Sequence, residues 1–137
     1  MTARTDTPAG TVEHFSELLG EGRLDALLKL YEEGATFVPE PGRAVSGRAS
    51  IRGELEGLVA LGPRMSGSVE QVLQAGDTAL VAYRWQMEAS APDGTPIRQQ
   101  GLSADVLRRR PDGSWGVIID DPYGGAGTTG TEDRAGA

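Results

Sequence analysis

Two adjacent carboxylates, Asp120 and Asp121, follow an apolar stretch that runs from Trp115 to Ile119. Such a stretch is typical of a buried strand. Its acidic end admits two interpretations: the acids terminate the strand, or one of them points into a cavity and transfers protons. Side chains alternate between the two faces of a strand, so only one acid would face the cavity. Asp121 is the expected turn former, because Asp before Pro favours turns.

Other residue types that carry chemistry are scarce. The 137 residues include no cysteine and one histidine, His14. This composition excludes thiolate chemistry, a cysteine-based metal site and a histidine-rich zinc site. No convincing Ser-His-Asp or Cys-His set is present, and no P-loop, dinucleotide-binding or HExxH pattern occurs. If the protein is an enzyme, the residues favour carboxylate acid–base chemistry without a metal or cofactor.

The charge and hydropathy of the chain limit the classes of partner that we expect it to bind. The formal net charge is −7, and binding to nucleic acid or to an anionic membrane needs a basic face. The N-terminal stretch lacks the apolar segment of a signal peptide. No run of about 18 apolar residues, the length that spans a membrane, occurs in the sequence. We therefore expect a cytoplasmic protein that binds neither nucleic acid nor membrane.

The length predicts one domain, with helices first and strands second. Helical spacing of apolar residues predicts helices near 12–19, 24–31 and 51–59, with a short strand at 35–42 before the third helix. Alternating residues then predict strands at 65–75, 78–91, 96–110 and 114–121, joined by the turns AGDT, PDGT and PDGS. We expect an α+β fold in which a curved antiparallel sheet wraps around three helices and leaves a pocket. The domain is expected to span 11–125, with disorder at 1–10 and in the Gly-rich tail 126–137.

Two stretches resemble the NTF2-like superfamily, which includes ketosteroid isomerase, limonene-epoxide hydrolase and the SnoaL-like polyketide cyclases. They are GRLDALLKLYEEGATFVPEPGRAVSGRASIRGEL at 22–55 and GLSADVLRRRPDGSWGVIIDDPYG at 101–124. The resemblance covers 11–125 and implies a cone-shaped sheet around the N-terminal helices. It also implies a small-molecule pocket and, as is common in this superfamily, a homodimer formed through the sheet.

Laid against ketosteroid isomerase, the chain keeps one of the functional positions. The isomerase tyrosine falls on Phe15, and its aspartate base falls on Pro39, with Glu40 beside it. Its aspartic acid on the penultimate strand matches Asp105. The resemblance therefore implies that Asp105 is an acid in the pocket.

The same register implies which side chains face the pocket from the last two strands. Ser103 and Asp105 face it from one strand, and Ile118 and Asp120 face it from the next. This register answers the opening question, because it turns Asp120 inward and Asp121 outward.

The strand at 78–91 admits two orientations. The register of the resemblance turns one row inward: Leu80, Ala82, Arg84 and Gln86. The apolar pattern turns the opposite row inward: Val81, Tyr83, Trp85 and Met87. Both interpretations hold if the apolar row is a dimer interface.

With Arg84 inward, Arg84, Asp105 and Asp120 would form a set similar to the Asp–Arg–Asp set of limonene-epoxide hydrolase. Burial and mutual repulsion separate the pKa values of two such acids, which leaves one ionised and one protonated. We therefore expect cofactor-free isomerisation, cyclisation or epoxide opening, with Asp105 and Asp120 catalytic and Arg84 orienting them. The alternative is a ligand-binding or dimeric assembly module of the same fold without catalysis.

The expected ligand is a small, apolar organic molecule of polyketide or terpenoid type. Its pocket is expected to include Phe15, Tyr31, Phe37, Glu40, Leu58, Ser103 and Ile118.

Overall fold

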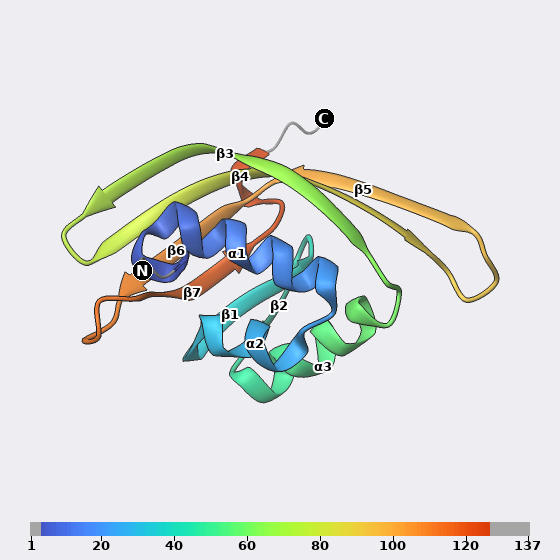
Figure 1. Ribbon diagram of the computed structural model, residues 1–137, viewed down its shortest axis with the longest axis horizontal. Coiled ribbons are helices and arrows are strands. Elements are labelled where there is room, and N and C mark those ends of the chain that lie inside the picture. The colour runs from blue at the N-terminus through green and yellow to red at the C-terminus, as the bar shows by residue number, and fades with distance from the viewer. Residues whose placement is uncertain (1–3, 127–137) are drawn as a thin grey trace.

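Three α-helices pack against the inner face of one curved, seven-stranded sheet in the computed structural model, which describes residues 4–126 (Figure 1). The helices are α1 (Pro8–Glu21), α2 (Leu24–Leu30) and α3 (Arg48–Val59). Short 3-10 helices, η1 (Arg4–Asp6) and η2 (Gly124–Ala126), lie at the two ends. Residues 4–10, expected to be disordered, form η1 and the first turn of α1. The expected disorder at 1–3 and 127–137 lies outside the described residues.

Helix α1 is fixed at both ends by signals that the sequence carries. The Thr7 hydroxyl caps the helix by accepting a hydrogen bond from the Gly10 backbone N–H at 3.0 Å, and Pro8 occupies the first turn. At the other end Gly22 adopts a left-handed conformation, with φ of 72°. Between these caps, Val12, Leu18 and Leu19 are buried against the rest of the molecule.

The strands follow the chain in an order that places the last two in the middle of the sheet. They are β1 (Tyr31–Glu40), β2 (Arg43–Ser46), β3 (Arg64–Ala75), β4 (Thr78–Ser90), β5 (Pro96–Leu102), β6 (Ala104–Arg109) and β7 (Trp115–Asp121). The order across the sheet is β2-β1-β7-β6-β4-β3, and β5 also pairs with β4. The expected helix–sheet arrangement is confirmed.

The expectation of a wholly antiparallel sheet is wrong at one pair. Strand β1 pairs with β7 in parallel, so the sheet is mixed. Turn signals in the sequence identify hairpins between neighbouring strands, but they carry no information about a pair whose members lie at opposite ends of the chain. The hairpin partner β2 was also not expected. It forms because Gly42, with φ of 84°, turns the chain back after Glu40.

The two orientations of β4 are resolved in favour of the apolar pattern. Tyr83, Trp85 and Met87 are 5–8% exposed, whereas the Arg84 side chain is 55% exposed and lies 3.6 Å from Glu70. The inward register of Leu80, Ala82, Arg84 and Gln86 is therefore wrong. The physical reason is that burying large apolar side chains stabilises the fold by about 1.5–3 kcal/mol each, whereas burying an unpaired charge is costly.

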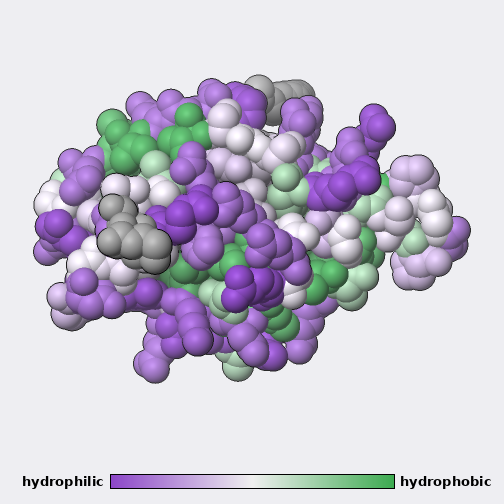
Figure 2. All heavy atoms as spheres, viewed as in Figure 1, coloured by the Kyte–Doolittle hydropathy of each residue, from purple (hydrophilic) through white to green (hydrophobic). Residues whose placement is uncertain are grey.

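The apolar row of β4 belongs to the core, so it is not a dimer interface. Exposed apolar side chains on the sheet lie elsewhere: Val72, Leu73, Leu80 and Ile119. Figure 2 shows that the viewed face is largely hydrophilic, with apolar residues gathered in small patches. A homodimer through the sheet stays a prediction.

The strand expected at 96–110 is divided at Ser103 without a change of register. Leu102 pairs with Arg84 on one side of the division, and Asp105 pairs with Val81 on the other. The Ser103 N–H donates to the Tyr83 carbonyl at 2.8 Å, but the Tyr83 N–H donates to the Ser103 hydroxyl at 3.1 Å. A side chain thus takes the place of a backbone carbonyl in the ladder.

A β-bulge at Ile118 decides which acid of β7 faces inward. Leu107 pairs with Val117 and Val106 pairs with Ile119, so Ile118 is an extra residue in β7. Without this bulge, the buried Trp115 and Val117 would place Asp121 on the inner face, because side chains alternate along a strand. With it, Asp120 is the inward acid, as such bulges re-aim the residues that follow.

Alanine substitutions at two glycines should change the stability of the protein in opposite directions. A Cβ added to Gly67 in β3 would lie 2.8 Å from the Tyr83 ring and against the Arg84 carbonyl. We expect Gly67→Ala to cost about 1–3 kcal/mol through overpacking. Gly57 in α3 has open space around it, so Gly57→Ala should stabilise by up to about 1 kcal/mol through helix propensity. Urea unfolding of both variants tests this difference, and equal midpoints would contradict it.

No helix within residues 4–126 is both long enough and apolar enough to cross a membrane.

Candidate active site

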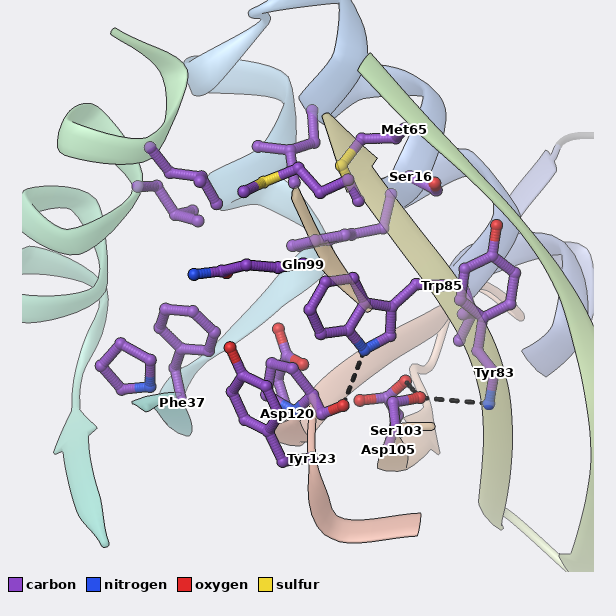
Figure 3. Close-up of a pocket in the computed structure, with 18 residues that line it drawn as sticks. Ser16, Phe37, Met65, Tyr83, Trp85, Gln99, Ser103, Asp105, Asp120 and Tyr123 are labelled. Carbon is purple, nitrogen blue, oxygen red and sulfur yellow. Dashed lines mark hydrogen bonds between the residues drawn. The ribbon is translucent and has the colours of Figure 1, made fainter. Parts of the chain in front are cut away.

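A cavity of about 140 Å³ lies between the helices and the inner face of the sheet. Its wall is mostly hydrocarbon and aromatic, and Ser103 and Asp105 lie together at one end, apart from Ser16 and Gln99 (Figure 3). Among the apolar residues that line it are Val12, Phe15 and Leu19 from α1, Phe37 from β1, and Leu55 and Leu58 from α3. Tyr83, Trp85 and Met87 of β4 form the sheet side.

Two acids, Asp105 and Asp120, line this cavity from neighbouring strands. They are directly opposite each other in the β6–β7 ladder. Side chains in such pairs have Cβ atoms about 4.5–5.5 Å apart. Their carboxyl groups therefore share one end of an otherwise apolar cavity, and the protonation state of each depends on the other.

Asp105 is buried, with 6% of the residue exposed. Its Oδ2 accepts a hydrogen bond from the Ser103 hydroxyl at 2.7 Å, whereas its Oδ1 is buried and has no hydrogen-bond partner in the part of the chain described. Burial raises the pKa of Asp105 well above its usual range, and the charge of Asp120 and the hydrogen bond between the two carboxyls add to this shift, although Ser103 and the Asp121 backbone oppose it. Asp105 is therefore the carboxyl that keeps a proton.

Asp120 is held by a phenol. Its Oδ2 accepts a hydrogen bond from the Tyr31 hydroxyl at 2.5 Å. Burial raises the pKa of Asp120, while the hydrogen bonds from Tyr31 and Asp105 lower it. Hydrogen bonds to a carboxylate favour the ionised form. We assign the negative charge of the pair to Asp120 and the proton to Asp105.

Tyr31 does not line the cavity, but it supports the acid pair through its contact with Asp120. It is fully buried, and its ring packs nearly perpendicular to that of Phe15, with centroids 5.6 Å apart. Burial and the nearby charge of Asp120 raise the pKa of Tyr31 well above its usual value, so its hydroxyl remains a donor. The phenol that reaches the acid pair therefore comes from Tyr31, the residue packed on Phe15.

The mouth of the cavity is formed partly by the segment that follows β7. The indole N–H of Trp85 donates to the Pro122 carbonyl at 2.7 Å, and the Tyr123 ring packs edge-on against Trp85 at 5.6 Å (Figure 3). A Cβ at Gly101 would lie 2.9 Å from the indole, so a glycine there lets Trp85 reach this carbonyl. Gln99 is exposed and also lines the cavity, which places it at the rim.

Most of the expected pocket residues lie at the site. Asp105, Asp120, Phe15, Phe37, Leu58 and Ser103 line the cavity. Tyr31 does not line it but contacts Asp120.

Three expected residues lie elsewhere. Arg84 is on the outer face of the sheet, so no Asp–Arg–Asp set forms. Glu40 is exposed and pairs with Arg43 at 2.7 Å. Ile118 is the bulge residue, which is half-buried and outside the cavity. Ile118 was placed inward by a regular register that the bulge in β7 interrupts. Arg84 was placed inward by the register of the resemblance, which puts the wrong face of β4 toward the helices.

Most of the residues on the sheet side of the cavity and at its mouth were not among the expected pocket residues. The apolar alternation of β4 would have identified Tyr83, Trp85 and Met87 had it been preferred over the register. The alternation that turns Ser103 and Asp105 inward also includes Gln99, which lies opposite Met87 in the β4–β5 ladder. Tyr123 follows the last strand, and no pattern in the sequence indicates its contact with Trp85.

Basic side chains and metal-binding clusters do not contribute to this site in the described residues. None of the residues lining the cavity is Lys, Arg or His. Within residues 4–126, no group of three or more His, Cys, Asp or Glu side chains is placed to hold a metal ion. The ionised member of the acid pair thus has hydrogen-bond donors around it but no cation lining the cavity.

The fold and this acid pair define a small α+β domain with a mostly apolar pocket that contains two carboxyl groups. A family model for the SnoaL-like domain matches residues 12–116. The chain therefore belongs to the SnoaL-like family, and the expected NTF2-like membership is confirmed. No curated protein matches the chain.

Solved structures share the fold at low sequence identity. A ketosteroid isomerase-like protein from Erwinia carotovora atroseptica is 15% identical with a TM-score of 0.74, covering 88% of this chain and 95% of that one. An NTF2-like protein with a cystatin-like fold from Novosphingobium aromaticivorans is 22% identical with a TM-score of 0.65, covering 82% and 75%.

A further similar structure is SalBIII, an epoxide hydrolase/cyclase-like enzyme with a role in pyran ring formation in the polyether salinomycin. It is 20% identical with a TM-score of 0.60, covering 82% of this chain and 86% of that one. At these identities the likeness shows the fold alone.

Proposed function

We propose that the protein is a cofactor-free acid–base enzyme that isomerises, cyclises or opens the epoxide of a small apolar molecule. Asp120 is the general base and Asp105 is the general acid. One observation carries this proposal: two carboxyls lie opposite each other at the end of an apolar cavity, and each is hydrogen-bonded to a different hydroxyl. Such different surroundings separate the pKa values of two acids, which is the arrangement that acid–base catalysis needs.

The pair acts on both ends of a reacting group at once. On an unsaturated ketone, Asp120 removes a proton beside the carbonyl while Asp105 protonates the carbonyl oxygen, which gives a dienol. The proton on Asp120 then returns at the far end of the double bond, and Asp105 takes back the proton of the enol oxygen. On an epoxide, Asp120 takes the proton of an attacking water or hydroxyl. Asp105 then gives its proton to the epoxide oxygen as the C–O bond breaks.

The cavity supports a neutral substrate. The acid pair carries one negative charge, and no basic side chain lines the cavity in the described residues. A carboxylate or phosphate substrate would therefore meet repulsion without compensation. The cavity volume of about 140 Å³ is close to that of an engineered apolar cavity of about 150 Å³ that binds benzene. The enclosed part accordingly fits about one six-membered ring, and larger substituents extend past Gln99.

A small panel of neutral rings tests the proposal. We expect the wild-type protein to convert a β,γ-unsaturated cyclohexenone to its conjugated isomer, followed by ultraviolet absorbance, or cyclohexene oxide to a diol, followed by chromatography. Arg84→Ala is the control, because Arg84 lies on the opposite face of the sheet and should leave any activity unchanged.

Binding and catalysis are distinguished in the same panel. A ring that raises the melting temperature of the protein occupies the cavity, because a ligand stabilises the state that it binds. Rings that bind without turnover across the whole panel, extended to bicyclic analogues, would favour the alternative of a ligand-binding module.

A further inference from the structure

Tyr31, the residue whose phenol reaches the acid pair, is fixed at its backbone and at its ring. Its carbonyl, at the start of β1, accepts hydrogen bonds from Arg48 Nε at 3.0 Å and Nη2 at 2.5 Å, and from Arg110 Nη2 at 3.4 Å. Its ring contacts Phe15 and Phe37, with centroids 5.6 and 6.4 Å away. Tyr31 is fully buried. Its hydroxyl therefore cannot exchange the acid pair for water without opening the fold.

The two acids receive unequal sets of hydrogen bonds. Asp120 accepts one from the Tyr31 hydroxyl at 2.5 Å. Asp105 accepts one from the Ser103 hydroxyl at 2.7 Å and another from the Asp121 backbone N–H. The carboxyls are also hydrogen-bonded to each other, which needs a proton on one of them because an ionised carboxyl only accepts. One proton can thus reside on either acid, and the donors around the pair decide between the two arrangements.

The number of donors favours a negative charge on Asp105, but the strength of the donors favours Asp120. Tyrosine ionises at about pH 10, far below an aliphatic hydroxyl or a peptide N–H, so its hydrogen is the most strongly donated of the three. The 2.5 Å contact also lies at the short end of the range of about 2.5–2.7 Å for a hydroxyl bound to an ionised group. We propose that Tyr31 is a positioning residue, which holds the negative charge of the pair on Asp120 and the proton on Asp105 and so decides which acid is the base.

The inference rests on the proposed function only for the use of the base, because the place of the charge is a property of the protein without substrate. Helices α1 and α3 line the cavity with no titratable side chain. The other titratable side chains near the pair come from the sheet and the segment after it: Tyr83 from β4, Asp121 from β7 and Tyr123. Burial, and after it the charge of Asp121, raises the pKa of Asp120. The hydrogen bond from Tyr31 must outweigh both effects.

Carbon-13 NMR of the Asp105 and Asp120 carboxyls during a pH titration tests where the charge lies. Between the two ionisation steps of the wild-type pair, Asp120 should show the chemical shift of a carboxylate and Asp105 that of a carboxylic acid. Tyr31→Phe keeps the ring and removes the hydroxyl. We expect the two shifts to exchange in this variant, because Asp105 keeps its two donors whereas Asp120 has lost the phenol. Asp105→Asn and Asp120→Asn assign the two signals.

Tyr83→Phe is the matched control. It also removes one phenol from the site, but in the described residues neither acid accepts a hydrogen bond from that phenol. Its carboxyl signals should match those of the wild type, and equal changes in both variants would overturn the inference. If Tyr31→Phe does not fold, protein grown on 3-fluorotyrosine carries the comparison. Its more acidic phenol is a stronger donor and should move the first ionisation of the pair to lower pH, and an unmoved ionisation would count against the inference.

Kinetics give a second measurement for any ring that the wild type converts. Tyr31→Phe should lower kcat/KM by about 10–100-fold at neutral pH, the usual weight of a hydrogen bond to a charged group. Loss of stability alone would not exchange the two carboxyl signals. A charge that stays on Asp120 in Tyr31→Phe, or that lies on Asp105 in the wild type, would overturn the inference. Exchanged signals in a protein that converts no ring would leave the inference standing and count against the proposed function.

Discussion

Replacing Asp120 by asparagine should lower kcat/KM by about 10²–10⁴-fold, the usual contribution of a positioned general base. The amide keeps the size of the side chain and its hydrogen bond from Tyr31, but it cannot accept the substrate proton. The variant should still bind the same neutral ring, because the apolar wall of the cavity is untouched. Steady-state rates on the ring panel, together with melting-temperature shifts on the same compounds, measure the two effects separately.

Asp121→Asn is the matched control for this change. Asp121 is the same residue type, one position along β7, and its side chain accepts a hydrogen bond from the Tyr123 N–H at 3.2 Å. Asparagine keeps a carbonyl oxygen for that contact, so both the turn and the activity should survive. Equal losses in the two variants would show that the acidic end of β7 acts through structure rather than through proton transfer.

Replacing Asp105 by asparagine should stabilise the protein at neutral and alkaline pH. The wild-type folded state holds a proton that the unfolded chain releases at about pH 3.9. Because the unfolded state then binds fewer protons, the free energy of unfolding falls as pH rises through the interval between the unfolded and folded pKa values of Asp105. Asparagine does not titrate, so the variant loses this part of the pH dependence. Its amide N–H groups also remain neutral donors facing the ionised Asp120.

Urea unfolding from about pH 4 to about pH 9 measures this effect, over a window that begins near the unfolded pKa. The stability difference in favour of Asp105→Asn should grow with pH and reach on the order of 1 kcal/mol or more, the scale of one improved buried hydrogen bond. Some pH dependence should remain, because burial also raises the pKa of Asp120. A difference that does not change with pH would contradict a protonated Asp105. Activity should fall at the same time, since the amide has no proton to give.

The helices and most of the strands could be predicted because each one buries a face whose apolar residues recur with the period of a helix or a strand. Ile51 and Leu55 lie at helical spacing in α3 and are almost fully buried, as is Leu27 in α2. The alternation along β4 identifies its inner face. Asp105 was found by resemblance to a known fold. In each of these cases the residue type and the local pattern agree with the tertiary position.

The errors have two sources. Arg84 was placed in the site by an assumed register that was preferred over the local pattern, although its apolar neighbours determine the orientation of the strand. The other features depend on long-range contacts. The division at Ser103 depends on a hydroxyl that reaches a backbone N–H twenty residues earlier in the chain. Tyr31 was expected in the pocket wall, but its contact with Asp120 joins residues 89 positions apart. Periodicity describes neighbours along the chain and carries no information about such pairs.

The extra residue in β7 bears on how relatives should be aligned. In this chain the inward acid lies three positions after the buried Val117, with Ile118 unpaired between them. A related protein whose last strand is regular would carry the equivalent acid two positions after its buried residue. An alignment that admits no gap here would match Asp120 to the wrong column, so a relative that retains the acid would be counted as having lost it.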